Sequence, residues 1–297
     1  MGRNEPSACP VSGTGKSHFF VDIPTFFCYD TDNIRQRKHV VRQVERADHE
    51  YTEFSGRFIV RDYYVLLGGF GSGKSEMALN LALEKAAQGS CMLVDLDVIN
   101  PYFRVSERED MLDKAGVELI SPPYSMKKIE IMSISPRVYA AFTPGDGTVI
   151  FDVGGDHVGA AALGQYKPNF SRIPPENLEI LFIVNPMRPV AADLQSAWSL
   201  MEKVEGVSRL RFTGIVNNGN MAEESDLSHL LAGYDLVKEL SEKTGVPVWG
   251  TCGQERILKE YEAYAKEHGL EEKYIGKLYP IEILMHRSWA KYLKEGL

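Results

Sequence analysis

The chain has 297 residues, a hydrophobic fraction of 44% and a formal net charge of −8. This length suits one large α/β domain or two small ones, and the hydrophobic fraction is ordinary for a globular protein with a sizeable core. The acidic balance excludes bulk attraction to DNA or to an anionic membrane, so there is no strong case for nucleic-acid binding.

Cysteine spacing, apolar runs and the N-terminal residues indicate a cytoplasmic protein. The four cysteines are scattered without a C-x-x-C pair, at Cys9, Cys28, Cys91 and Cys252, which disfavours structural zinc and a disulfide framework. No apolar run approaches the length of a membrane span, and Met1–Pro6 lacks the apolar core of a signal peptide. We therefore expect a cytoplasmic location and no transmembrane segment.

Residues 1–57 differ in pattern from the rest and are predicted to form an N-terminal appendage. Its first part is irregular, and Asn33–Glu53 predicts a basic helix. A solvated helix face is a commoner explanation for such a pattern than a membrane or nucleic-acid contact. Ser12–Ser17 imitates a phosphate-binding loop, but Pro10 stands where the first glycine belongs and no strand candidate precedes it. We ascribe this imitation to chance.

The next segment fits the pattern G-x-x-x-x-G-K-[ST] at every fixed position. The loop consists of Gly68, Gly69, Phe70, Gly71, Ser72, Gly73, Lys74 and Ser75. An apolar strand candidate precedes it, and a helix that includes Glu76 follows, which is the context that the motif requires. Glycines let the backbone N–H groups surround a phosphate chain, and the helix N-terminus adds a partial positive charge. Lys74 supplies a full charge and Ser75 a hydroxyl for Mg²⁺. The sequence thus predicts binding of a nucleoside triphosphate.

Apolar strand candidates alternate with helical stretches from residue 58 onward. Strands are expected at Tyr63–Leu67, Cys91–Asp95, Val117–Ile120, Thr148–Asp152, Leu178–Val184, Leu210–Asn217 and Val246–Gly250. Helices are expected at Ser75–Ala87, Pro189–Glu202, Leu227–Lys243, Gln254–Lys266 and Pro280–Lys294. This alternation predicts an α/β fold with a doubly wound, mostly parallel sheet of about seven strands and helices on both faces. We assign residues 58–267 to this P-loop domain and residues 268–297 to a C-terminal helical extension.

Acidic residues follow two of the strand candidates. Asp95 and Asp97 stand at positions i and i+2, so both point toward the nucleotide edge of the sheet. Such a pair suits Mg²⁺ held through water and a carboxylate that orients an attacking water. Asp152 ends the fourth strand, and the glycines behind it permit a mobile loop through Gly164 that senses a γ-phosphate. A solvated loop start and a plain strand-end turn are the alternative interpretations.

Residues 60–265 resemble the nucleotide-binding family that includes MinD, ParA, the nitrogenase iron protein and the cobyrinate and dethiobiotin synthetases. The resemblance is carried by the glycine loop and by Asp95–Asp97, Asp152–Asp156, Arg211–Asn218 and Pro247–Gln254. It implies a P-loop NTPase of the SIMIBI class, with the active site at the carboxyl edge of the sheet.

The resemblance also implies roles for individual residues. Lys74 and Ser75 match the phosphate and Mg²⁺ residues, and Asp97 matches the switch aspartate that orients the hydrolytic water. Asp152 matches the outer-sphere Mg²⁺ acid. Asn217, followed by Asn218, matches the asparagine that meets the adenine base.

One position departs from the ParA/MinD branch of this family. That branch has a lysine where this chain has Gly69, and the lysine reaches the phosphates bound by a dimer partner. An ATP-sandwich dimer is therefore not implied, and a homodimer stays open. The N-K-x-D motif by which GTP-specific members read guanine does not follow the loop, which favours ATP.

Two enzymatic functions agree with these residues. The first is Mg²⁺-dependent, slow ATP hydrolysis that switches an unidentified protein partner. The second is an ATP-dependent small-molecule kinase or ligase, for which Asn100–Arg104 and Tyr124–Lys128 would supply an acceptor site. His157 is interpreted as exposed and uncommitted. A catalytically inactive binding module is a third reading, and the complete set of acids argues against it.

Overall fold

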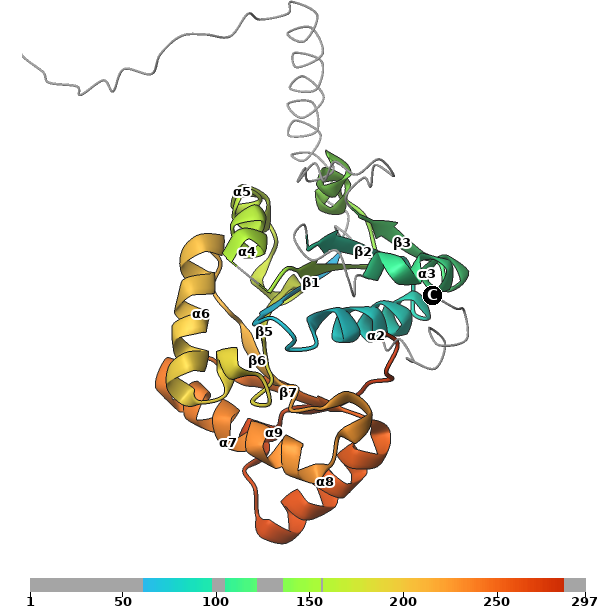
Figure 1. The fold of residues 1–297 in the computed structure, drawn as a ribbon. Helices are drawn as coiled ribbons and strands as arrows, with labels where there is room; N and C mark the ends of the chain where they lie inside the picture. The colour runs from blue at the N-terminus through green and yellow to red at the C-terminus, as the bar shows by residue number, and fades with distance from the viewer. Residues whose placement is uncertain (1–60, 98–104, 122–135, 156, 286–297) are drawn as a thin grey trace, which may run out of the picture. The chain divides into compact units, whose positions relative to one another are not determined.

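The computed structural model describes residues 61–97, 105–121, 136–155 and 157–285, shown as a ribbon in Figure 1. The chain divides into Met1–Arg57 and Phe58–Leu297. The predicted appendage with its basic helix lies outside the described residues. So do Asn100–Arg104, Tyr124–Lys128 and the side chain of His157.

A parallel sheet of eight strands forms the centre of the described region. The strands are β1 (Asp62–Gly68), β2 (Cys91–Leu96), β3 (Val117–Ile120), β4 (Thr148–Val153), β5 (Leu178–Val184), β6 (Gly214–Asn217), β7 (Val248–Gly253) and β8 (Lys277–Pro280). Their order is β3-β2-β4-β1-β5-β6-β7-β8, and every neighbouring pair is parallel. All residues of β2 and β4 are buried, as expected for strands with both faces covered.

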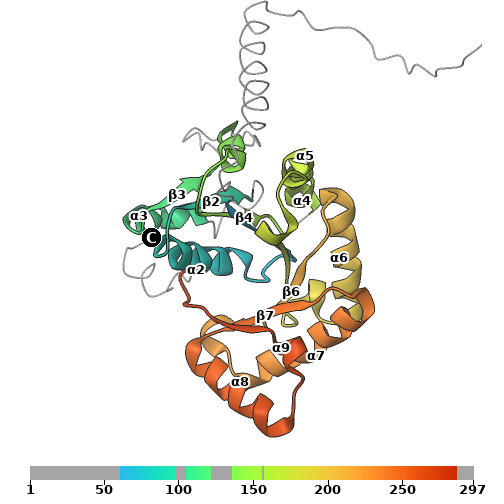
Figure 2. The ribbon, with the colours of Figure 1, turned by 180° about the vertical axis from the view of Figure 1, so that it is seen from behind.

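Helices cover both faces of this sheet. They are α2 (Lys74–Ala86), α3 (Glu109–Lys114), α4 (His157–Gly164), α5 (Lys167–Phe170), α6 (Leu194–Ser208), α7 (Leu227–Thr244), α8 (Glu255–His268) and α9 (Glu272–Ile275). Short 3-10 turns include η4 (Pro189–Ala191) and η5 (Ala222–Glu224). Figures 1 and 2 show α2 and α6 on opposite sides of the sheet. Two apolar cores result, one under α2 and α3 and one under α4 to α8. The predicted α/β fold with a doubly wound parallel sheet is confirmed.

Side-chain caps define where α6 and α7 begin. Asp193 caps α6 and Asp226 caps α7, and in each case the third helical residue bonds back to the cap in a capping box. The helix predicted over Pro189–Glu202 therefore begins later, at Leu194, and runs on to Ser208. The strand predicted over Leu210–Asn217 is shorter as well, because pairing with β5 begins at Gly214.

The segment after residue 268 differs from the predicted helical extension. It forms the single turn α9 and then the edge strand β8, in which Tyr279 is buried and pairs with Cys252 of β7. Gly276 turns the chain into the strand at φ 63°, and an added Cβ would lie 2.7 Å from the Trp249 carbonyl oxygen, which leaves no space for a side chain. Residues 281–285 are not helical. The helix predicted over Pro280–Lys294 was therefore wrong for its first six residues, and its remainder lies outside the described residues. The sequence did not reveal β8, because four strand residues are too few for a recognisable alternation.

The sheet order places the glycine loop at a topological switch point. From β1 the chain crosses to β2 and β3 on one side, returns to β4 beside β1, and then continues through β5 on the other side. Crevices form at the carboxyl edge of such a sheet where the direction of winding reverses. The loop after β1 opens into this crevice.

Candidate functional site

The loop after β1 has the geometry of a phosphate cradle. Gly71 and Gly73 have positive φ values of 72° and 90°, which a side chain would make strained. Helix α2 then begins at Lys74 with no side-chain cap. Its first N–H groups and its dipole are thereby available to an anion.

Lys74 is held inside this cradle. Its side chain is buried, and Nζ donates to the carbonyl oxygen of Gly69 at 2.9 Å. Gly155, in the loop after β4, lies against the same amine, because an added Cβ would be 2.9 Å from Lys74 Nζ and 2.8 Å from Phe70 N. The loop after β4 thus meets the phosphate loop at the backbone of Gly155, which suits a segment that responds to a bound phosphate.

Two side chains from other strands support the outside of the cradle. Asn218, just after β6, donates from Nδ2 to the Ser72 carbonyl at 2.7 Å and lies so close to Gly73 that no side chain fits there. Arg188, after β5, donates from Nε to the Gly71 carbonyl at 3.1 Å. Arg188 forms no ion pair with any described residue. Its charge therefore stands beside the cradle.

A side chain at Gly69 would meet the side chains of Val190 and Leu200. An added Cβ would lie 2.6 Å from Val190 Cγ2 and 3.1 Å from Leu200 Cδ2. The segment that carries Val190 also carries Arg188, so η4 lies against the loop at the point where the ParA/MinD branch has its lysine. A lysine at this position would require the Val190 side chain, which is 45% exposed, to move.

Three carboxylates lie at the carboxyl ends of β2 and β4. Asp95 and Asp152 face each other in register, and both are buried. Asp95 Oδ1 accepts the N–H of Asp97 at 2.9 Å, and Asp97 Oδ1 approaches Gly154. Burial raises the pKa of Asp152 to about 6, and a hydrogen bond from Ser75 and the charge of Lys74 oppose this rise.

The carboxylates and Ser75 fit a Mg²⁺ ion. Asp152 Oδ1 is buried and has no hydrogen-bond partner among the described residues, so a water bound to a cation would complete its bonding. No group of three or more His, Cys, Asp or Glu in the described region could hold a metal by itself. That composition agrees with an ion whose remaining ligands are phosphate oxygens and water.

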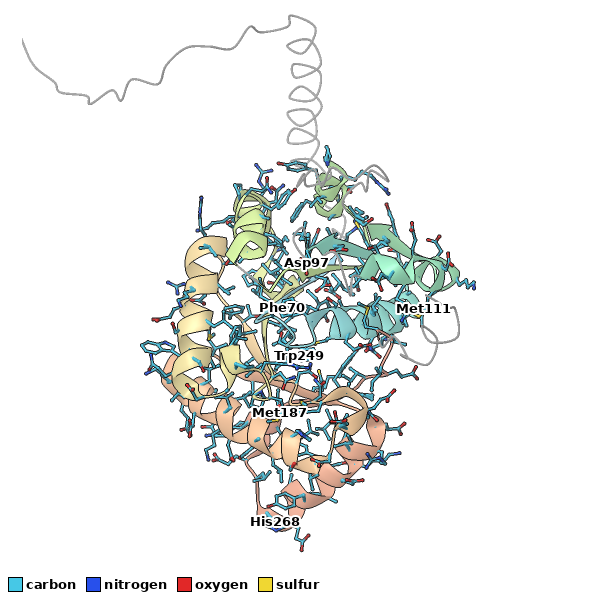
Figure 3. The ribbon with its side chains drawn as sticks, in the orientation of Figure 1. Phe70, Asp97, Met111, Met187, Trp249 and His268 are labelled. Carbon is cyan, nitrogen blue, oxygen red and sulfur yellow. The ribbon has the colours of Figure 1, made fainter. Side chains whose placement is uncertain are left out.

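A cavity of about 650 Å³ begins at the loop and extends past the ends of β6 and β7. Lys74, Ser75 and Asp97 line its polar end, and Phe70 stands at the rim with 65% of its surface exposed. Figure 3 labels Phe70 and Asp97, which lie at this end of the cavity. Leu230 and Ile257 line the other end. Its size suits a nucleotide-sized ligand, with phosphates at one end and an apolar ring at the other.

Asn217 does not line this cavity, although Asn218 does. The Asn217 side chain is fully buried, donates to the Leu230 carbonyl at 3.0 Å and accepts the Gly219 N–H at 3.0 Å. The expected contact of Asn217 with the base is not supported by this placement. Asn217 instead links the end of β6 to α7 and shapes the loop over residues 218–220.

Sequence reasoning missed several residues that line the cavity. Arg188 follows the β5 strand candidate in Asn185-Pro186-Met187-Arg188, and a strand-end arginine would have been a signal to look for. Ile281, Ile283 and Met285 also line the cavity. The sequence did not indicate that these three residues line a cavity, because their segment was predicted to be helical.

The chain has the P-loop NTPase fold. No protein-family model matches it, and no curated protein does either. Structures of FtsY are among the solved structures that match this chain, with TM-scores below 0.5. The cell division protein FtsY from Thermotoga maritima is 17% identical, with a TM-score of 0.44 over 69% of this chain and 67% of that one.

Two further structures complete this comparison. The signal recognition particle receptor FtsY from Elizabethkingia anophelis, in complex with GDP, is 15% identical with a TM-score of 0.41, over 67% of this chain and 59% of that one. FtsY from Mycoplasma mycoides is 13% identical with a TM-score of 0.45, over 73% and 69%. Likeness at this level says nothing about which nucleotide this chain binds, and the resemblance to the MinD/ParA family stays a prediction. None of the described helices has both the length and the apolar character needed to cross a membrane.

Proposed function

We propose that this protein binds Mg²⁺ and ATP and hydrolyses ATP slowly, as a switch ATPase coupled to a protein partner. The observation that carries the proposal is the uncapped start of α2 with buried Lys74, placed beside the buried carboxylate of Asp152. A cation and a triphosphate together would satisfy these charges. The coupling to a partner rests on the loop after β4, which meets the cradle at Gly155.

Each residue has a distinct task in this reaction. The first N–H groups of α2 bind the phosphates, and Lys74 stabilises the negative charge on the transferring phosphoryl group. Asp97, at the polar end of the cavity, orients the attacking water. Ser75 and Asp152 would hold the Mg²⁺, which neutralises phosphate charge when bound.

Arg188 provides a second cation from the same chain. In a ParA/MinD-type site this charge comes from the lysine of a dimer partner, and this chain has Gly69 in place of that lysine. Arg188 touches the cradle at Gly71 and lines the cavity. Catalysis in this chain therefore needs no partner subunit for its second positive charge.

Adenine fits the far end of the cavity better than guanine. Guanine presents two neighbouring donors, N1–H and the 2-amino group, which a carboxylate accepts well. Among the described lining residues the carboxylates are Asp97, at the polar end, and Glu76, which accepts the N–H groups of Leu284 and Met285. Among the residues that the structure describes, the base end therefore offers no carboxylate acceptor to guanine.

Steady-state phosphate release from ATP and from GTP, with Mg²⁺, tests the proposal. We expect slow, ATP-selective release that is lost in Lys74→Ala and in Asp97→Ala. Wild-type turnover by Lys74→Ala would refute the mechanism, and equal competition by GTP would refute the base assignment. Tight ATP binding without release would contradict hydrolysis and favour the kinase or ligase alternative, in which an acceptor replaces water.

A further inference from the structure

A short segment after β8 lines the cavity and is bonded to the helix that follows the phosphate loop. We call Ile281–Met285 the strap. The Ile281 N–H donates to the Gly253 carbonyl at 2.9 Å, which ties the start of the strap to the end of β7. The rest of the strap lies along α2.

Two side chains of α2 hold the strap through its backbone. Asn80 bonds Glu282 twice: Nδ2 donates to the Glu282 carbonyl at 2.9 Å, and Oδ1 accepts the Glu282 N–H at 2.8 Å. The Glu76 carboxylate accepts the N–H groups of Leu284 and Met285, the latter at 3.2 Å to each oxygen. Hydrogen bonds to a charged acceptor are stronger than neutral ones, so Glu76 is a firm anchor.

The strap residues alternate in what they face. Ile281, Ile283 and Met285 line the cavity, whereas Glu282 between them is exposed. This period of two is that of an extended chain with one face turned to the cavity. The strap thus presents three apolar side chains to a space whose other end holds the phosphate loop.

Two further apolar residues of the cavity lining come from the other core. Leu230 at the start of α7 and Ile257 at the start of α8 belong to the core under those helices, while Ile281 and Met285 belong to the core under α2. Gly253 lines the same space. Apolar side chains from both cores thus line this part of the cavity, together with the backbone of Gly253. Such a lining suits a flat, mostly apolar ring.

We propose that the strap is the outer wall of the base site, and that Glu76 and Asn80 are positioning residues that set its distance from the phosphate loop. This inference rests on the proposed function, because it takes the triphosphate to be bound at Lys74. The adenine ring of ATP would lie between the strap and Leu230 and Ile257. Since Glu76 directly follows Ser75, the same turn of α2 positions the phosphates and the base wall.

The proposal predicts that the two halves of the nucleotide respond differently to changes in the strap. Ile283→Ser removes apolar surface from the wall, and Asn80→Ala removes both bonds to Glu282. Each should weaken ATP binding by about fivefold or more, equivalent to about 1 kcal/mol. Inorganic tripolyphosphate carries the charge without the base, so its affinity should change by less than about twofold.

Titration calorimetry of the full chain with Mg²⁺ and either ATP or tripolyphosphate measures this difference. Glu76→Ala should weaken ATP binding, whereas Glu76→Gln retains an acceptor oxygen for the strap and should restore most of it. Glu109→Ala, at the first position of α3, removes a first-turn glutamate that is exposed and distant from the strap in sequence. It serves as the matched control and should behave as wild type. Thermal unfolding of each variant confirms that it is folded.

The outcomes separate the two proposals. Equal loss of ATP and tripolyphosphate affinity in Ile283→Ser and Asn80→Ala would overturn the strap as a base wall and leave nucleotide binding at the loop intact. Unchanged ATP affinity in both variants would do the same. A wild-type protein that binds neither compound would overturn the proposed function, and the base wall with it.

Discussion

Two helical glycines should respond to the same substitution with opposite signs. Replacing a glycine inside a helix by alanine ordinarily stabilises a protein by about 0.5–1 kcal/mol, because alanine loses less backbone entropy on folding. Gly206 in α6 has no neighbouring atom within 4 Å of an added Cβ. Gly233 in α7 has the side chain of Asn217 there, with Cγ at 2.6 Å. We expect Gly206→Ala to stabilise the fold and Gly233→Ala to destabilise it.

The size of the second effect follows from the bonds of Asn217. Its amide bonds the Leu230 carbonyl and the Gly219 N–H, and all of these groups are buried. Displacing the amide leaves buried polar groups unsatisfied, at about 1–3 kcal/mol for each group. Against this loss, the gain in helix propensity is about 0.5–1 kcal/mol. With two such groups, Gly233→Ala should therefore lower the free energy of unfolding by about 1–5 kcal/mol.

Urea denaturation of the two variants and the wild type measures both changes. Asn217→Ala in the Gly233→Ala background is the control, because removing the amide removes the collision, so the two substitutions should cost less together than separately. Of the two glycine variants, only Gly233→Ala should lower ATP affinity, since Asn217 supports the loop that carries Asn218. If both glycine variants were stabilised equally, the placement of Asn217 against α7 would be refuted.

Further expectations concern the phosphate end of the cavity. Asp97→Ala should slow ATP hydrolysis by about 10²–10⁴-fold and leave ATP affinity within about threefold of wild type, because the task of Asp97 is to orient water. Single-turnover and binding assays measure the two quantities separately. A loss of affinity as large as the loss of rate would contradict this role. If the guanidinium stabilises charge at the cradle, Arg188→Ala should lower the hydrolysis rate by about tenfold or more, and Arg188→Lys should recover part of the rate. Unchanged rates in both variants would show that Arg188 only hydrogen-bonds the Gly71 carbonyl. The raised pKa of Asp152, about 6 against 3.8, means that the folded state binds the proton more tightly than the unfolded state. Without nucleotide and Mg²⁺, this group should therefore stabilise the fold most below about pH 4, and that contribution, up to about 3 kcal/mol, should be lost as the pH rises through about 6. Asp152→Asn should abolish this component of the pH profile of unfolding, and an identical profile in the variant would refute it.

Features set by short-range chemistry could be predicted from the sequence. The glycines at positions 71 and 73 adopt positive φ, which glycine allows at little cost, and α2 begins at Lys74, one residue before the predicted start at Ser75. The strands β1 to β5 are short apolar runs, and their ends lie close to the predicted ends. Asp95 and Asp152, near the ends of β2 and β4, lie side by side because parallel strands end at one edge of the sheet. In each case the deciding interactions lie within a few residues, or in a rule of sheet geometry that needs no knowledge of side-chain packing.

Features that depend on register and on distant partners needed the tertiary structure. At the end of β6, adjacent side chains turn to opposite faces, so Asn217 enters the core under α7 while Asn218 reaches the phosphate loop. The edge strand β8 has only four residues, and it forms because β7 offers an unpaired edge. The strap is held by Glu76 and Asn80, some 200 residues earlier in the chain. Contacts over such separations leave no periodic pattern in the sequence, because each partner alone is an ordinary residue of a helix or a loop.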